Sequence, residues 1–297
     1  MYTFSNKLKV FAIVLIILGA IGVVSGFMNS HKSLEEVKIM LAEEASHHGS
    51  DHAEATHEVT AGDSHTDEND SHEVSTDSQD HANSSAAEEH HEDEHAEHVM
   101  HQIHNRPYAA LYVAAFFFMM ISLGVLAFYA VQYAAQAGWS PVIFRVMEAI
   151  TYYLLPGAVI VVAIALWAGP HLFIWMDPDV VAHDKIIQGK ASWLNTQWFV
   201  IRAIIFIGGW SFYRWISRKY SIAQDTAEDN SNFKKGFRWS AGFLVFYIYT
   251  SSMMSWDWIM SVDPHWFSTL FGWYVFASMF VSGITVIALM IIYLKSR

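Results

Sequence analysis

Ionisable side chains inside hydrophobic stretches are the residues of this sequence best suited to chemistry. Glu148, Arg202 and Asp257 each lie within a long run of apolar residues. A charged group in the middle of a membrane helix costs roughly 2.5–3.5 kcal/mol on insertion scales, so each needs a partner or a function. Arg202 and Asp257 are expected at similar depth, where a packing ion pair is the simplest interpretation. A proton or quinol site is the functional alternative.

Glu148 lies near one end of its hydrophobic run and has two interpretations. Tyr152 follows one helical turn later on the same face, and Pro156 leaves the carbonyl group of Tyr152 without its helical hydrogen-bond donor. A carboxylate, a hydroxyl and a free carbonyl together are groups that can begin a proton path. The alternative is an ion pair with Arg145, three residues earlier. The sequence leaves both open.

Two loops combine an Asp-Pro step with tryptophan and histidine. Aspartate before proline is a helix-start signal, so Asp263 is expected to cap the last hydrophobic helix. Histidine and carboxylates at a membrane edge also suit proton exchange or contact with a quinol head group. The candidate proton-pathway residues are Glu148, Tyr152, Arg202, Asp257, Asp263 and His265, and the candidate quinone-edge residues are His171, Asp177, Trp256 and Trp258. No catalytic residue and no metal ligand is assigned.

Six hydrophobic stretches are long enough to cross a bilayer, which needs about 20 apolar residues in a helix. They are residues 10–28, 107–134, 147–169, 194–215, 239–260 and 266–294. Lysine and arginine near the span ends number 11 on the side that holds both termini and five on the other. Both termini are therefore predicted to be cytoplasmic. The predicted fold is an all-α integral membrane protein with six transmembrane helices.

A segment rich in histidine and acidic residues separates the first span from the second. Residues 31–105 hold 20 of the 29 acidic residues and 14 of the 17 histidines. So little apolar area cannot offset a backbone ordering cost of roughly 1–2 kcal/mol per residue, and disorder is predicted. Short helices at 34–44 and 97–104 are the expected exceptions. Such a composition can bind Zn²⁺ or Cu²⁺, but its irregular spacing favours a solvated periplasmic tether.

The predicted organisation has three parts: an uncleaved membrane anchor (1–30), this segment (31–105) and a polytopic membrane domain (106–297). Several classes of function lack support. The chain has no cysteine, which excludes disulfides and iron–sulfur ligation by its own side chains. Outside the segment, histidine occurs only at 171, 183 and 265, at span ends or in loops, so a b-type haem is not expected. Neither a nucleotide-binding loop nor a nucleophile motif occurs, and nucleic acid is not an expected partner.

Four stretches of the sequence resemble a known family of membrane proteins. They are residues 109–117 (AALYVAAFF), 138–141 (GWSP), 175–179 (WMDPD) and 254–269 (MSWDWIMSVDPHWFST). These strings are similar to the second polytopic subunit of bacterial alternative complex III, a quinol:electron-acceptor oxidoreductase with polysulfide-reductase-type (NrfD-like) membrane subunits. The resemblance covers the first span and nearly everything from Pro107 onward. Family members have about ten spans, so further spans are expected in a longer or separate chain.

The resemblance implies a location in the bacterial inner membrane and a four-helix bundle made by spans two to five. It implies three kinds of partner: a sister NrfD-like subunit, an iron–sulfur and molybdopterin-like subunit, and multihaem cytochromes c. Haem and iron–sulfur clusters would lie in those partners, with none in this chain, and menaquinol would supply the electrons. This subunit would contribute proton translocation or an auxiliary quinone site and would not be catalytic alone. The alternatives are an anchor without a conducting role, and a metal or cation transporter.

Overall fold

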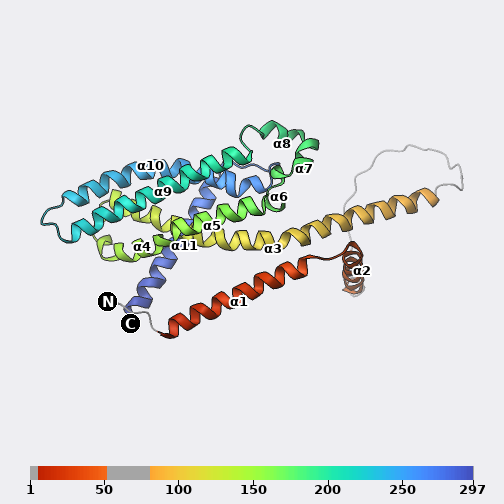
Figure 1. Cartoon of the computed structure of the whole chain (residues 1–297), viewed down its shortest axis with the longest axis horizontal. Coiled ribbons are helices and arrows are strands. Elements are labelled where there is room, and N and C mark those ends of the chain that lie inside the picture. The colour runs from red at the N-terminus through yellow and green to blue at the C-terminus, as the bar shows by residue number, and fades with distance from the viewer. Residues whose placement is uncertain (1–5, 52–80, 297) are drawn as a thin grey trace, which may run out of the picture. The chain divides into compact units, whose positions relative to one another are not determined.

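The computed structural model describes residues 6–51 and 81–296, whose regular structure is entirely helical (Figure 1). The chain divides into two compact units, Met1–Pro107 and Tyr108–Arg297. The α-helices are α1 (Asn6–Ser30), α2 (Leu34–Asp51), α3 (His81–Ala134), α4 (Phe144–Ile150), α5 (Leu154–Trp167), α6 (Gly169–Leu172), α7 (Pro178–His183), α8 (Lys185–Lys190), α9 (Thr196–Asp225), α10 (Ser231–Trp258) and α11 (Phe271–Lys295). Short 3₁₀ turns are η1 (Ser140–Ile143), η2 (Thr151–Tyr153), η3 (Ile174–Met176) and η4 (Met260–Val262).

The first unit contains α1, α2 and the beginning of α3. The predicted short helices at 34–44 and 97–104 are confirmed as parts of α2 and α3. The prediction of disorder is wrong for 45–51 and 81–96, which are helical as well, and residues 52–80 lie outside the described residues. Helix formation here has a packing basis, because Val37 and Ala96 are buried and Lys38 forms an ion pair with Asp93.

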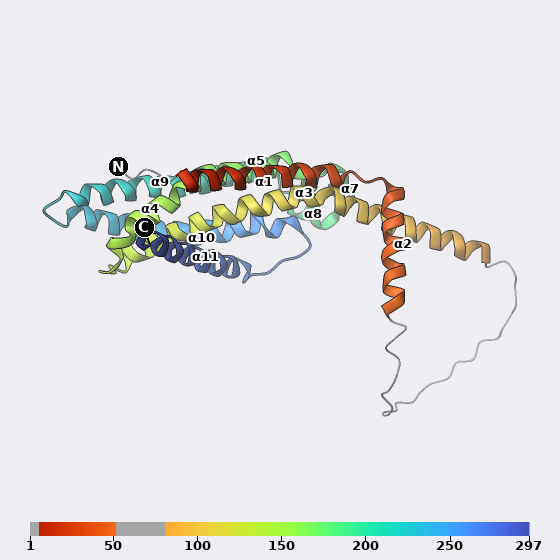
Figure 2. The same ribbon diagram turned by 90° about the horizontal axis from the view of Figure 1, so that it is seen from below.

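In the second unit, α3, α5, α9 and α10 run alongside one another, with α4 at one end and α6 to α8 at the other (Figures 1 and 2). All four long helices contribute to one hydrophobic core, for example through Met119, Leu154, Phe206 and Trp258. They are the elements expected from spans two to five. Helix α11 packs against this core through Met279 and other apolar residues.

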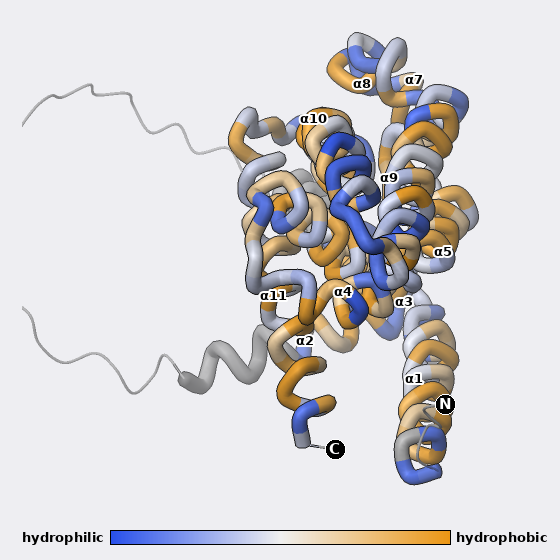
Figure 3. Tube along the Cα trace, turned by 90° about the vertical axis from the view of Figure 1, so that its left-hand side faces the viewer, coloured by the Kyte–Doolittle hydropathy of each residue, from blue (hydrophilic) through white to orange (hydrophobic). Residues whose placement is uncertain are grey.

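Five helices of the described part are long and apolar enough to cross a membrane. They are Lys9–Ser30, His95–Ala134, Ser140–Trp167, Thr196–Asp225 and Phe271–Lys295. Helix α10 contains most of the fifth predicted span but is not among them, since its sequence is more polar on average than those of the five. Figure 3 shows the turn between α9 and α10 as hydrophilic and α5 as largely hydrophobic. Membrane crossing by α10 stays a prediction.

The last helix begins later than the sequence suggested. Helix α11 starts at Phe271 after Leu270, whereas the predicted span began at 266 with Asp263 as its cap. The capping role of Asp263 is therefore wrong. Its carboxylate instead accepts the backbone N–H of His265 at 3.1 Å, which closes a local turn before the helix.

Helices α3 and α11 meet at two glycines. A Cβ atom added at Gly124 would overlap the carbonyl oxygen of Met279, and one added at Gly283 would lie 3.0 Å from the backbone nitrogen of Val125. Small residues let membrane helices approach closely, so this contact sets the position of α11.

Gly124→Ala is expected to destabilise the protein by about 1–3 kcal/mol, because the added methyl group must push the α11 backbone away. Gly208→Ala in α9 is the matched control, since nothing lies within 4 Å of a Cβ atom there. We expect the control to be neutral or slightly stabilising. Thermal unfolding in detergent measures both, and equal unfolding temperatures for the two variants would contradict the close contact.

Candidate functional site

A buried ion pair joins α9 and α10. Arg202 Nε donates to Asp257 Oδ2 at 2.5 Å, and Arg202 Nη2 donates to Asp257 Oδ1 at 3.1 Å. Asp257 is fully buried and Arg202 is 9% exposed. The predicted pairing of these two residues is confirmed, and its fork geometry fits the planar guanidinium.

Trp193 completes this pair, and the sequence had indicated no such role for it. Its indole Nε1–H donates to Asp257 Oδ1 at 2.8 Å, and its backbone carbonyl accepts from Arg202 Nη2 at 3.0 Å. The Arg202 guanidinium carbon also lies 4.3 Å from the centre of the Trp193 ring. The carboxylate thus accepts three hydrogen bonds from two side chains. We call this group the Asp257 end of the bundle.

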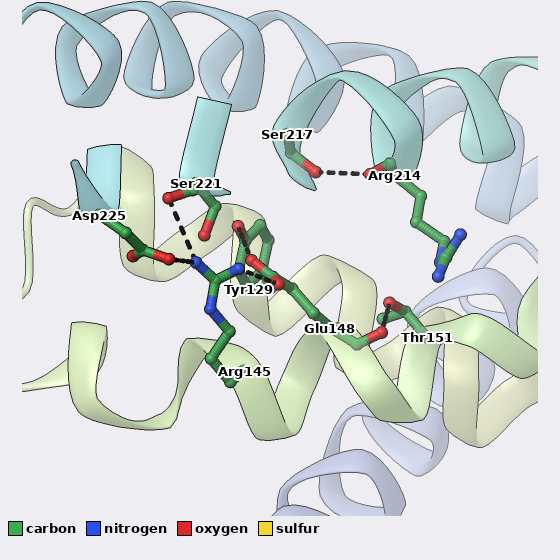
Figure 4. A network of polar contacts seen from close by, with 8 residues as sticks. All are labelled: Tyr129, Arg145, Glu148, Thr151, Arg214, Ser217, Ser221 and Asp225. Atoms are coloured by element: carbon green, nitrogen blue, oxygen red, sulfur yellow. Dashed lines mark hydrogen bonds and ion pairs between the residues drawn. The ribbon is translucent and has the colours of Figure 1, made fainter. Parts of the chain in front are cut away.

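The second buried carboxylate lies in α4. Arg145 Nη1 donates to Glu148 Oε2 at 2.6 Å, and the Tyr129 hydroxyl donates to Glu148 Oε1 at 3.2 Å (Figure 4). The Thr151 hydroxyl donates to the Glu148 backbone carbonyl at 2.9 Å. The ion pair that the sequence offered as one alternative is therefore present. We call this group the Glu148 end.

Arg145 also connects α4 to the last turns of α9. Its Nη2 group forms an ion pair with Asp225 and donates to the Ser221 carbonyl at 3.4 Å. The Arg145 side chain is 43% exposed, whereas that of Glu148 is 6% exposed. Arg145 thus links the buried carboxylate of Glu148 to the surface of the protein.

Tyr152 does not share the surroundings of Glu148, contrary to the prediction. It is 70% exposed, and its ring lies 5.0 Å from the guanidinium carbon of Arg214. The expected common face assumed a continuous α-helix of 3.6 residues per turn. Instead α4 ends at Ile150 and the 3₁₀ turn η2 follows, which rotates later side chains further per residue.

Buried hydroxyl groups line α10 between the two ends. We call Ser240, Tyr247, Ser251 and Ser255 the hydroxyl stripe; all four are at most 5% exposed. Their spacings of seven, four and four residues place them on one helical face. The Ser240 hydroxyl lies 2.7 Å from the Tyr213 hydroxyl, and the Tyr247 hydroxyl donates to Met279 Sδ at 3.4 Å. The signal was present in the sequence as serine and tyrosine at helical spacing, but it was not recognised.

The two ends are far apart in the second unit. Arg202 and Ser221 on α9 are separated by 19 residues, which corresponds to about 28 Å along a helix axis. The arrangement is therefore a helical core with an ion-paired carboxylate near each end and hydroxyl groups between them.

The loops next to the Asp257 end are held by aspartates. Asp177 caps α7, with Pro178 at the first helical position, by accepting the Asp179 backbone N–H at 3.0 Å. Asp184 caps α8 and accepts from His265 Nε2 at 2.6 Å. Slight burial would raise the pKa of Asp184, but hydrogen bonds from the backbone N–H groups of Ile187 and Ile186, and then from His265, bring that pKa below its usual range.

Asp184→Asn is expected to lower the unfolding temperature near neutral pH but not in strong acid. A carboxyl group whose pKa is depressed by folding stabilises the protein above the ordinary aspartate pKa of about 3.9, and this stabilisation is lost as the pH falls through the lowered pKa. Asparagine caps a helix about as well as aspartate but does not titrate. Thermal unfolding of both proteins across pH checks this, and a difference that persists unchanged in strong acid would contradict it.

The candidate quinone-edge residues are not gathered in one place by their contacts. The His171 ring stacks on Tyr108 with ring centres 4.4 Å apart. Trp258 is fully buried in the core, where its ring centre lies 6.1 Å from that of Trp210 and its carbonyl accepts from the Tyr112 hydroxyl at 2.8 Å. Trp258 is therefore a core residue, which corrects its assignment to an edge. Trp256 is half-buried.

Within residues 6–51 and 81–296, no three histidine and acidic side chains are grouped so that they could hold a metal ion. The central part of the His-rich segment, 52–80, lies outside these residues. No protein-family model and no curated protein matches the sequence.

Proposed function

We propose that this chain is a proton-handling membrane subunit of a quinol-oxidising respiratory complex of the alternative complex III type. The observation that carries the proton-handling part is the placement of Glu148 and Asp257 near opposite ends of one helical core with hydroxyl groups between them. Intramembrane carboxylates are costly and commonly serve proton relays. The resemblance of residues 254–269 to such subunits supports the redox part, and these residues include Asp257 itself.

In this proposal protons enter at the Glu148 network and pass along the hydroxyl stripe toward Asp257. Hydroxyl groups both donate and accept hydrogen bonds, so they can relay a proton. Steps of four to seven residues along α10 are about 6–10 Å, longer than one hydrogen bond, so the path includes water molecules between hydroxyls. The proposal also includes an auxiliary quinone site, for which His171, Asp177 and Trp256 are the candidate edge residues.

The proposal includes six membrane spans, cytoplasmic termini and a periplasmic His-rich segment in the bacterial inner membrane. It also includes the partners expected of such a complex, namely the sister membrane subunit, the iron–sulfur subunit and multihaem cytochromes c, with menaquinol as the electron source. The chain would hold none of the haem or iron–sulfur groups itself.

A second candidate is a membrane anchor without a conducting role. One observation favours it: both buried carboxylates are already engaged in ion pairs, with Arg202 and Arg145. A satisfied pair needs no function beyond packing. The two candidates agree on the complex and differ only in whether the charges move protons.

Purification of the tagged chain from its native membrane tests the respiratory assignment. We expect the native complex to carry haem absorption and iron–sulfur signals and to have a mass far above that of this chain. Isolation of the intact chain without redox-active partners would refute it.

A further inference from the structure

Arg214 is a half-buried arginine on α9 with no carboxylate partner among the described residues. Its Nε atom is buried and has no hydrogen-bond acceptor, and its guanidinium carbon lies 5.0 Å from the ring centre of Tyr152. Figure 4 shows the guanidinium turned away from Glu148 and Arg145. In contrast, Arg145 pairs with two carboxylates. Within the described residues Arg214 is therefore compensated only by the Tyr152 ring and by the charge of Glu148 at longer range, without an ion pair.

The neighbouring residues on the same face of α9 increase this imbalance. Arg218 follows one turn later, is exposed and likewise forms no ion pair within the described part of the chain. Like charges four residues apart on a helix repel each other. Ser211, one turn before Arg214, has a buried hydroxyl oxygen without a hydrogen-bond partner. The nearby carboxylates, Glu148 and Asp225, are both occupied by Arg145.

An anion that balances these arginines must bind at the surface. The cavity that Arg214 and Arg218 share with Glu148 and Tyr129 measures about 10 Å³. That volume holds one water molecule and excludes a phosphate group. The exposed side of Arg218 and the outer edge of Arg214 are the remaining places for an anion.

The surface around Arg214 is apolar and aromatic. Tyr152, whose ring lies beside Arg214, is 70% exposed, and Trp215, the next residue on α9, is 59% exposed. Exposed tyrosine and tryptophan at helix ends are typical of membrane interfaces. A free phosphate ion gains nothing from such a surface, whereas the acyl chains of a phospholipid can pack along it.

We propose that Arg214 and Arg218 form a binding site for the phosphate of an anionic phospholipid at the membrane edge. Basic side chains between helices on the cytoplasmic side are suited to anionic head groups. The assignment to the cytoplasmic leaflet rests on the proposed topology, but the site itself requires no proton-handling function.

Titration of the full chain in detergent with phosphatidylglycerol, phosphatidylcholine or inorganic phosphate tests the proposal, with the unfolding temperature as the readout. We expect a saturable rise with phosphatidylglycerol alone. Arg218→Gln should weaken the apparent affinity about fivefold and Arg214→Gln with Arg218→Gln about 30-fold, as expected for one and two lost basic groups at an anionic surface. Arg218 is exposed, so the single variant serves even if the double variant unfolds.

Lys219→Gln is the matched control because it removes the same charge from the next position, where the ammonium lies 5.6 Å from the Trp215 ring centre. Its affinity for phosphatidylglycerol should stay within twofold of wild type. An equal loss in this control would show a diffuse electrostatic effect and overturn the site. Equal stabilisation by inorganic phosphate would overturn the assignment of a phospholipid as the ligand. If the wild type does not respond to phosphatidylglycerol, both the site and its ligand are overturned. Failure here is distinguishable from failure of the proton proposal, because lipid binding is measured by the unfolding temperature and proton transfer by proton release in liposomes.

Discussion

Asp257→Ala is expected to lower the free energy of unfolding by about 3–5 kcal/mol, because it leaves the charge of Arg202 buried without a counter-ion. Arg202 is 9% exposed, and the lost carboxylate oxygens are its only charged partners within the described residues. The indole N–H of Trp193 loses its acceptor as well. Chemical denaturation in mixed micelles measures the change.

The double variant Arg202→Met with Asp257→Leu is the control for this prediction. It removes both charges and replaces them with apolar side chains, so most of the lost stability should return. A double variant that is no more stable than Asp257→Ala would contradict the assignment of the loss to an unpaired arginine. So would a cost below about 1 kcal/mol for Asp257→Ala, the range of an exposed pair.

Glu148→Gln is expected to reduce the rate of proton release during quinol oxidation by about 100-fold. This is the lower end of the range for removing a positioned proton-transfer group. Glutamine keeps the size of the side chain and an oxygen for the Tyr129 hydroxyl but carries no exchangeable acid proton. Stability should change by less than about 1 kcal/mol, since Arg145 is partly exposed and keeps Asp225. A pH-sensitive dye inside liposomes that contain the native complex measures the release.

Asp225→Asn controls for the position of Arg145. It removes the exposed carboxylate from the same arginine and leaves Glu148 in place. We expect near-normal proton release in this variant. If both variants lose proton release equally, the network is structural and the carboxylate of Glu148 transfers no proton.

The charge pair of the Asp257 end could be predicted from the sequence because the cost of burying a charge is large. Two opposite charges at the same depth in apolar helices are most easily neutralised by pairing with each other. The same argument named Arg145 as a partner for Glu148, and both pairs are present. The helices themselves were predicted for the same reason, since apolar stretches of that length have little alternative in a membrane.

Local backbone changes defeated other predictions. Tyr152 does not lie on the same helical face as Glu148 because a 3₁₀ turn follows α4. Such a turn is a common end of an α-helix and differs little from it in free energy. Asp263 binds the backbone of His265 in a turn and not the start of α11, although an Asp-Pro step fits both structures. Composition alone also underestimated α2 and the start of α3, where a few buried residues such as Val37 accompany helix formation.

Features that depend on the packing of several helices could not be derived from single positions. The hydroxyl stripe could not be predicted without the buried face of α10, because a serine hydroxyl in a helix more often contacts solvent or the helix backbone than it relays a proton. The sequence shows Arg214 only as a charge at a span end, because its lack of an ion pair depends on Arg145, which pairs with both nearby carboxylates.

The number of protons released per electron in liposomes containing the native complex tests the central claim most directly, with Tyr247→Phe compared to Tyr249→Phe. Tyr247 belongs to the hydroxyl stripe and is 2% exposed, while Tyr249 lies two residues away on α10 and is 67% exposed. Each variant removes one hydroxyl and keeps the ring. The proposed path predicts a lower ratio for Tyr247→Phe and the wild-type ratio for Tyr249→Phe. A wild-type ratio in both would contradict conduction along the stripe.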